Sequence, residues 1–245
     1  MKTLYLDIFS GISGDMFLGA MVDLGVDFDA LEAELKKLKL EGYTLSANRR
    51  QKCAIDGVKF DVHLADGGEG DHSHSHSHDH EHSHEHSHGD GAGHGHSRNF
   101  AQISEMIHAS ALSDWVKEKS VAVFQRVANA EGKIHGLPPF EVHFHEVGAV
   151  DAIVDVTAAA IGVDRLGIQR ITSSPVALGH GFIGGSHGRL PLPAPATLEL
   201  LKGIPTVPAN VEWETVTPTG AAILRTLVDD YAPMPAMTVE AVGLG

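Results

Sequence analysis

Apolar and polar residues follow two patterns along the chain, one typical of strands and one of helices. Near the N-terminus, "KTLYLDIF" is rich in strand-forming residues and stops at the glycine-bearing turn "SGISGD", after which "MFLGAMVDLG" has helical apolar spacing. The same order of strand, turn and helix is expected at "FEVHFHEVGAVDAIVDV". Strands that alternate with helices predict an α/β fold with a mixed sheet and flanking helices, as a single domain over residues 1–245.

The other segments extend this pattern. "YTLSANRRQKCAIDGVKFDVHLA" predicts one or two strands around a turn at Asp56–Gly57, with Cys53 as a small core residue. "QRITSSPVAL" predicts a strand, and "GHGFIGGSHGRLPLP" predicts a loop. Helices are expected over 27–40, 99–110, 113–135, 194–203 and 217–231.

A histidine-rich run separates the first of these elements from the rest. Residues 67–98 combine mainly Ser, Asp, Glu, Gly and His, which bury too little apolar area to offset the entropy of ordering. We therefore expect a disordered loop inserted into one α/β unit, with a linker between two lobes as the alternative. Neutral imidazole binds zinc, copper, nickel and cobalt, and a flexible chain does not select among them. The candidate metal ligands of the run are His72, His74, His76, His78, His80, His82, His84, His86, His88, His94 and His96.

Charge and cysteine content narrow the possible partners. The chain has 32 acidic and 18 basic residues and a formal net charge of −14, which disfavours nucleic acid and anionic membranes. Cys53 is the only cysteine, so an intrachain disulfide and a thiolate-rich metal site are both excluded. No apolar stretch reaches the roughly 18 residues needed to span a bilayer. We expect a cytoplasmic protein that holds metal through nitrogen and oxygen, unless the histidine run is a passive low-complexity tract.

The segment "VHFHEVGAVDAIVDV" places five possible metal ligands around one strand-to-helix turn. His143 and His145 are two apart on the expected strand, so they would project from the same face, and Glu146 begins the turn. Asp151 and Asp155 are four apart and share one face of the following helix. This arrangement favours a site for a divalent transition metal. A helix cap is an equal alternative for Asp151 alone, and a half-buried structural histidine is the alternative for a single imidazole.

Two turns that open helices are candidate anion sites. "DIFSGISGDM" and "TPTGAA" both offer hydroxyls and backbone amides where a helix begins, but neither has the GK[ST] ending of an NTPase phosphate loop. Asp15 would repel a bare phosphate, so it could instead contact metal or a substrate hydroxyl. Simple capping explains the threonine turn at least as well. The candidate residues are Ser10, Gly11, Ser13, Gly14, Thr217, Thr219 and Gly220.

Taken together, these stretches resemble the LarC family, the nickel-insertion proteins of nickel-pincer cofactor biosynthesis. The resemblance is carried by "DIFSGISGDMFLGAMVDLG", "AEGKIHG", "VHFHEVGAVDAIVDV", "HGRLPLPAPATLELLKG" and "TPTGAAIL", with the histidine run between the first and the second. These stretches extend over most of the chain, and several are long and unusual enough to be specific.

The resemblance implies an enzyme of the lyase class, a nickel chelatase or cyclometallase. Family members insert Ni²⁺ into pyridinium-3,5-bisthiocarboxylic acid mononucleotide with CTP hydrolysis, forming two nickel–sulfur bonds and one nickel–carbon bond. On this chain, the histidine run would capture nickel, and His143, His145 and Glu146 would hold it for transfer. Glu146 or a nearby aspartate, with Asp15 as the candidate, would accept the proton lost as the nickel–carbon bond forms. The glycine and threonine turns would bind the substrate's phosphate.

The resemblance also implies partners. Family members continue beyond "VGLG" into a C-terminal domain that binds CTP and Mn²⁺ or Mg²⁺, so this chain is expected to be the N-terminal, nickel-binding portion. Its expected partners are the mononucleotide, that C-terminal domain, other copies of this chain in an oligomer and, as recipient of the cofactor, the lactate racemase apoprotein. Two rival functions stay open: a nickel or zinc storage or delivery protein without chemistry of its own, and a metal-dependent hydrolase built on H-x-H-E.

Overall fold

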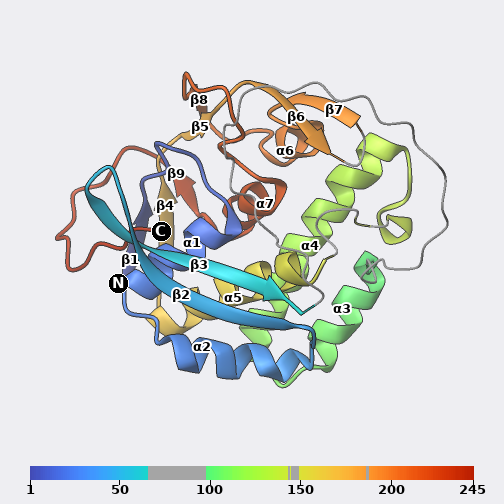
Figure 1. The fold of residues 1–245 in the computed structure, drawn as a ribbon, viewed down its shortest axis with the longest axis horizontal. Helices are drawn as coiled ribbons and strands as arrows, with labels where there is room; N and C mark the ends of the chain where they lie inside the picture. The colour runs from blue at the N-terminus through green and yellow to red at the C-terminus, as the bar shows by residue number, and fades with distance from the viewer. Residues whose placement is uncertain (66–97, 143, 145–148, 186–187) are drawn as a thin grey trace.

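Several small sheets lie around a group of central helices in the computed structural model of the chain, which describes residues 1–65, 98–142, 144, 149–185 and 188–245 (Figure 1). The helices are α1 (Gly14–Asp23), α2 (Phe28–Leu35), α3 (Phe100–Ala109), α4 (Asp114–His135), α5 (Val150–Leu166), α6 (Pro195–Leu200) and α7 (Pro218–Leu227), with 3₁₀ turns η1 (Lys36–Leu38) and η2 (Pro139–Glu141). The strands are β1 (Thr3–Leu6), β2 (Tyr43–Lys52), β3 (Ile55–Leu64), β4 (Arg170–Ser173), β5 (Val176–Leu178), β6 (Gly181–Gly185), β7 (Gly188–Leu192), β8 (Thr206–Pro208) and β9 (Asp230–Tyr231).

Parallel and antiparallel pairing both occur, as the sequence predicted. Strands β1, β4 and β9 form a parallel sheet in the order β1-β4-β9, and β5 pairs with β8 in parallel. Strands β2 and β3 form a long antiparallel hairpin, and β6 and β7 form a shorter one. A parallel bridge between Ile12 and Val216 joins the segment before α1 to the segment before α7. The α/β prediction with mixed pairing is therefore confirmed.

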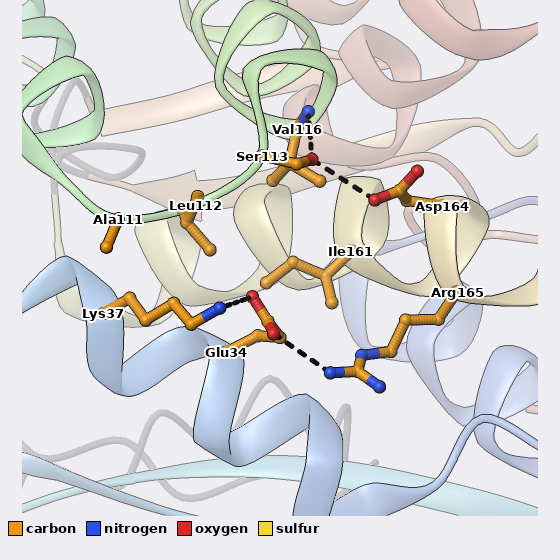
Figure 2. A pocket seen from close by; sticks show the side chains of 9 residues that line it. All are labelled: Glu34, Lys37, Ala111, Leu112, Ser113, Val116, Ile161, Asp164 and Arg165. Carbon is orange, nitrogen blue, oxygen red and sulfur yellow. Dashed lines mark hydrogen bonds and ion pairs between the residues drawn. The ribbon is translucent and has the colours of Figure 1, made fainter.

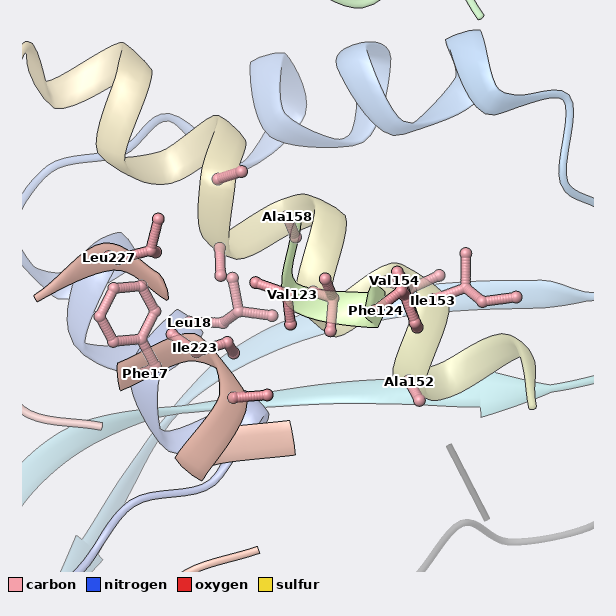
Figure 3. Packing of buried hydrophobic residues seen from close by; sticks show 14 of the residues in the cluster. Phe17, Leu18, Val123, Phe124, Ala152, Ile153, Val154, Ala158, Ile223 and Leu227 are labelled. Atoms are coloured by element: carbon pink, nitrogen blue, oxygen red, sulfur yellow. The ribbon is translucent and has the colours of Figure 1, made fainter. Parts of the chain in front are cut away.

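Helix α5 is the centre of the hydrophobic core. It packs against α1, α2, α4 and α7, and nearly every residue from Ala152 to Val163 is buried. Figure 3 shows Leu18 of α1, Phe124 of α4 and Ile223 of α7 gathered around it, all almost inaccessible to solvent. Because Ala158 to Ala160 have short side chains, neighbouring helices can approach the α5 backbone closely. The fold thus holds the N-terminal end of α5 in a fixed place beside α1.

Local capping signals set several helix boundaries where the sequence placed them. Ser113 Oγ accepts a hydrogen bond from the Val116 amide at 3.3 Å and begins α4, and Gly136 ends it in the left-handed conformation. Asp27 caps α2 in the same way, through the Ala30 amide at 2.7 Å. The start of α2 and both ends of α4 follow the prediction because their signals are local, whereas α2 ends at Leu35, short of the predicted residue 40.

The turn of the β2–β3 hairpin differs from the prediction. The chain reverses at Cys53 and Ala54, both with positive φ, so the expected turn at Asp56–Gly57 is wrong and Cys53 is exposed rather than part of the core. Gly57 lies inside β3, where Leu244 of the C-terminal segment packs against its Cα. The glycine serves this close approach and not a turn.

Two further predictions fail where glycine or proline misled the pattern. The expected strand "QRITSSPVAL" divides at Ser174–Pro175 into β4 and β5, which belong to different sheets. The expected loop "GHGFIGGSHGRLPLP" contains the β6–β7 hairpin, although its glycine content suggested irregular chain. Glycines are tolerated here because one face of the hairpin is exposed.

Candidate functional site

The turn before α1 is organised around the hydroxyl of Ser13. Ser13 Oγ accepts a hydrogen bond from the Met16 amide at 3.4 Å and donates one to the Asp15 carboxylate. Gly11, with φ of 93°, packs so tightly against the Thr215 carbonyl that a Cβ atom would overlap it. The predicted glycines therefore serve the shape of this turn, and the Ser13 hydroxyl serves as a helix cap.

The threonine turn before α7 lies directly beside the serine turn. Thr217 Oγ1 accepts a hydrogen bond from the Gly220 amide at 3.1 Å and shares another with Thr219 Oγ1 at 2.9 Å. The Ile12 amide donates to the Thr215 carbonyl at 2.8 Å, and the Thr217 amide donates to the Ile12 carbonyl at 3.2 Å. The two predicted anion-binding turns are thus joined by backbone hydrogen bonds. We call them the paired turns, residues 10–15 and 215–220.

Asp155 of α5 packs against the turn before α1, at Gly14. Its carboxylate packs against the Cα of Gly14, where a Cβ would overlap Asp155 Oδ2. Its Oδ1 atom is inaccessible to solvent and has no hydrogen-bond partner in the described part of the chain. Burial, and then the negative charges of Asp15 and Asp151, hold the pKa of Asp155 well above its ordinary value. We call Asp15, Asp151 and Asp155 the acid cluster.

Asp151 does not act as the cap of α5. The N-cap is Ala149, which has no side chain capable of capping, and no side-chain hydrogen bond closes this helix end. Asp151 Oδ1 is buried, and within the described residues it has no hydrogen-bond partner. The capping alternative considered for Asp151 is therefore wrong, and this carboxylate is available for another role.

Lys59 of β3 is a cation beside the acid cluster that the sequence patterns did not single out. Its Nζ lies 3.0 Å from Asp61 Oδ1 and 3.6 Å from Asp15 Oδ2. Burial lowers the pKa of Lys59, but hydrogen bonding to Asp61 and the charge of Asp15 more than offset this, so its pKa is raised. Lys59 therefore stays protonated and partly neutralises Asp15. The period-two pattern "KFD" in a strand was the signal that could have found this Lys59–Asp61 pair.

The predicted metal site is only partly within the described residues. Asp151 and Asp155 are brought to one place, whereas His143, His145 and Glu146 lie outside the described part of the chain, as do the eleven histidines of the run. Within the described ranges, no three His, Cys, Asp or Glu side chains gather closely enough to hold a metal ion. The acid cluster alone is thus no complete metal site, and the histidine ligands stay a prediction.

The described residues just before α5 do not form the strand that the sequence suggested. Pro139–Glu141 is the 3₁₀ turn η2, and neither Val142 nor Phe144 belongs to a strand. His143 and His145 themselves lie outside the described residues, so their expected position on one face stays a prediction. Val142 and Phe144 are each only 1% exposed, and the Phe144 ring centroid lies 6.3 Å from that of Phe124. The Phe144–Phe124 contact packs Phe144 against α4, and Val142 lies beside Gly132 of the same helix.

A cavity of about 370 Å³ lies near the opposite, C-terminal end of α5 (Figure 2). Across it, Glu34 receives hydrogen bonds from Lys37 at 2.6 Å and Arg165 at 3.0 Å. Ser113 donates to Asp164 at 3.2 Å. The hydrogen bond from Lys37 is the main cause of the lowered pKa of Glu34. Because these charges satisfy one another, the cavity lacks the unpaired groups of the acid cluster, and we do not assign the functional site to it.

Comparison with known proteins identifies the family. The family model described as nickel insertion protein matches residues 4–245. A relative from Geobacillus kaustophilus named pyridinium-3,5-bisthiocarboxylic acid mononucleotide nickel insertion protein is 47% identical over 245 residues. Relatives named putative nickel insertion protein are 44% identical over 245 residues in Syntrophobacter fumaroxidans and 54% identical over 248 residues in Maridesulfovibrio salexigens. The chain belongs to the nickel insertion protein family.

The matches cover this chain completely but the relatives only in part. They extend over 100% of this chain, and over 56% of the first two relatives and 60% of the third. No solved structure matches. Among the helices that the structure describes, none is long and apolar enough to cross a membrane.

Proposed function

We propose that this protein binds Ni²⁺ and inserts it into pyridinium-3,5-bisthiocarboxylic acid mononucleotide, as a nickel chelatase or cyclometallase of the lyase class. Family membership over residues 4–245 and the names of relatives at 45–47% identity support this proposal most directly. The geometry supports it through the acid cluster, because buried carboxylate oxygens without partners suit a site that meets a cation.

The proposed chemistry needs a nickel ligand set and a proton acceptor. In the proposal, His143, His145, Glu146, Asp151 and Asp155 hold the Ni²⁺ substrate, with the histidine run raising the local nickel concentration. Two substrate sulfurs then bind nickel, and one ring carbon exchanges its bond to hydrogen for a bond to nickel. The displaced proton passes to a carboxylate, for which Glu146 and Asp15 are the candidates. Asp15 is oriented for this by Ser13 and Lys59.

The paired turns are the proposed site for the substrate's phosphate. The hydroxyls of Ser13 and Thr217 already cap helices, so the donors would be the backbone amides at the starts of α1 and α7 together with Ser10, Thr219 and the flanking glycines. Lys59 would offset part of the repulsion from Asp15. This extends the sequence-based hypothesis by making two separate candidate turns into one adjacent pair.

Further parts of the proposal concern CTP, the recipient of the product, and the assembly and location of the protein. The family resemblance suggests dependence on CTP with Mn²⁺ or Mg²⁺ in the further length that the relatives possess, and delivery of the product to the lactate racemase apoprotein. We also propose an oligomer and a cytoplasmic location, the latter from the negative charge and single cysteine. None of the described residues is assigned to CTP.

The test is reconstitution. The protein is mixed with NiCl₂, the mononucleotide, CTP, Mn²⁺ or Mg²⁺, and the remaining C-terminal part of the Geobacillus kaustophilus relative, and the nickel-containing product is sought by mass spectrometry. A product of the expected mass supports the proposal, and its absence from the complete mixture contradicts it. The matched control omits this protein and retains the C-terminal part.

Storage or delivery of metal is the second candidate, favoured by the histidine run. Deleting 71–96 should lower the amount of bound nickel but leave insertion intact when nickel is abundant. The double substitution His143→Ala and His145→Ala should abolish insertion even in excess nickel. The opposite pattern, with function lost only on deletion of the run, would favour storage. Hydrolysis of simple esters or phosphoesters would favour a hydrolase.

A further inference from the structure

Residues 242–245 lie against α1 with their glycines inward and their apolar side chains outward. Cβ atoms on Gly243 and Gly245 would overlap backbone atoms of α1, so both glycines face that helix. Val242 and Leu244 alternate with the glycines and are 68% and 42% exposed. The hydrophobic effect favours the reverse arrangement, with apolar side chains inward. This segment therefore keeps apolar side chains on the surface of the protein.

Two hydrogen bonds of Leu244 hold the segment in place. The Val58 amide of β3 donates to the Leu244 carbonyl at 2.8 Å, and the Leu244 amide donates to Asp23 Oδ2 at 2.9 Å. The second hydrogen bond is the main cause of the lowered pKa of Asp23, so the contact is made to an ionised carboxylate. The outward side chains thus extend from a segment that is fixed to both α1 and β3.

The β2–β3 hairpin continues this apolar surface near its turn. Ile55 and Gly57 are two apart on β3 and share one face. A Cβ atom on Gly57 would lie 3.3 Å from Leu244 Cβ, so Leu244 packs over this face, and Ile55 is 62% exposed. In Figure 1 the turn of the hairpin and the C-terminal segment lie on the same side of the molecule. We call Ile55, Val242 and Leu244 the tail patch.

Two cations border the tail patch. Arg50 pairs with Gly57 and Lys52 pairs with Ile55 across the hairpin, so both cations share the face of the patch. Both are exposed, and no carboxylate in the described part of the chain lies within ion-pair distance of either. An apolar centre with a polar rim is the usual arrangement of a protein interface. Because the rim carries unpaired cations, the surface suits a protein partner with acidic groups around an apolar centre.

The tail patch lies next to the acid cluster. Lys59 follows Gly57 by two residues on the same face of β3, and its Nζ lies 3.6 Å from Asp15 Oδ2. Gly245 packs against the Met16 carbonyl, one residue from Asp15 on α1. A partner bound to the tail patch would therefore be brought beside the proposed site of nickel insertion.

The course of the chain indicates which partner the surface binds. Residues 242–245 form part of the tail patch, so any residues that follow them in a longer relative begin beside it. The match covers 56% of the Geobacillus kaustophilus relative, which leaves 44% of that protein outside it. We infer that the tail patch binds the C-terminal part of the longer family members, through a surface that is apolar at its centre and acidic at its rim. This choice of partner rests on the proposed function.

The test is a calorimetric titration of this protein with the C-terminal part of the Geobacillus kaustophilus relative, once circular dichroism shows that this part is folded. Wild type should form a complex. Val242→Glu should weaken the complex about ten-fold or more, because it places a carboxylate in the apolar centre of the interface. Val207→Glu on β8 is the matched control, because this valine is 44% exposed, and it should bind like wild type.

The rim is tested separately. The double substitution Arg50→Gln and Lys52→Gln should weaken the complex by about two- to five-fold at low salt, and by less at about 0.5 M NaCl, where exposed charges are screened. Thermal unfolding should be the same in all variants, since these side chains are exposed. Wild-type affinity in Val242→Glu, or no complex with wild type, would overturn the inference. So would an oligomer of this protein alone that Val242→Glu disrupts, because the tail patch would then bind a second copy.

Failure of the inference and failure of the proposed function are separable. Nickel bound at equilibrium dialysis should be equal in wild type and Val242→Glu, since the tail patch contains no candidate metal ligand. In the reconstitution, Val242→Glu should need about ten-fold more of the C-terminal part than wild type and then reach the same yield. An unchanged requirement for the C-terminal part would overturn the inference and leave the proposed function intact. A complex that depends on Val242, without product in the complete mixture, would do the reverse.

Discussion

The paired turns and the acid cluster lie against each other, but their polar groups are satisfied in opposite ways. In the paired turns, the Ser13 and Thr217 hydroxyls and the backbone around Ile12 all have partners. In the acid cluster, Oδ1 of Asp151 and Oδ1 of Asp155 are buried and, within the described ranges, without partners. A buried polar group without a partner costs free energy, so the cluster is maintained at the expense of stability. The satisfied groups thus hold the turns in shape, and the unsatisfied oxygens lie where the proposed function places nickel.

The largest expected effect is on the paired turns. Gly11→Ala should lower the free energy of unfolding by about 3 kcal/mol or more, since the residue has a positive φ and its Cβ would overlap the Thr215 carbonyl. Urea denaturation measures this. Gly184→Ala is the control and should change the midpoint very little, because its Cβ would meet open space. Equal effects of the two substitutions would show that the paired turns are not tightly packed.

The acid cluster should respond with the opposite sign. The folded-state pKa of Asp155 is raised, so the stability contributed by its proton is present below the unfolded pKa of about 3.9 and is lost as pH rises through the folded pKa. Asp155→Asn should therefore increase the free energy of unfolding at pH 8 by about 1–3 kcal/mol, and by much less near pH 4. Denaturation across this pH range checks it. A destabilised variant at pH 8 would mean that Asp155 has a stabilising partner.

A smaller effect is expected at the cap of α7. Thr217→Ala removes the acceptor of the Gly220 amide and should cost about 1 kcal/mol. Thr217→Ser retains the hydroxyl and should recover most of this. If Ser fails to rescue stability, the methyl group rather than the cap is responsible.

The smallest effect is expected at the boundary between the two regions. Lys59→Met removes a partly exposed ion pair and should change stability by less than about 1 kcal/mol. Because the charge of Lys59 lowers the pKa of Asp155, Lys59→Met should raise that pKa further. The stability of the variant should therefore decline at a higher pH than the stability of wild type. Denaturation at a series of pH values measures this shift. It should vanish when Lys59→Met is made in Asp155→Asn, because the titrating carboxyl is then absent. A downward shift would contradict the assigned charges.

Local signals made the helix starts and the two turns predictable, and tertiary contacts explain the errors. The helix expected over 217–231 ends at Leu227, because Asp230–Tyr231 pairs with β4 as strand β9. Ser13, Ser113 and Thr217 cap helices through neighbours within three residues, so the sequence alone locates them. The adjacency of the paired turns depends on Ile12–Thr215 pairing between distant segments, which no local pattern encodes. Gly57 suggested a turn although its purpose is contact with Leu244. Asp155 was a candidate by helical spacing, but its burial against Gly14 required the fold.

Two variants of α5 provide the sharpest test of the proposal that nickel insertion takes place at the acid cluster. In the reconstitution described above, nickel-containing mononucleotide is quantified by mass spectrometry for Asp155→Asn and for Asp164→Asn, which lies at the other end of α5 beside the cavity. Asp164→Asn should give a wild-type yield, and a folded Asp155→Asn should give none. A wild-type yield from Asp155→Asn would contradict it.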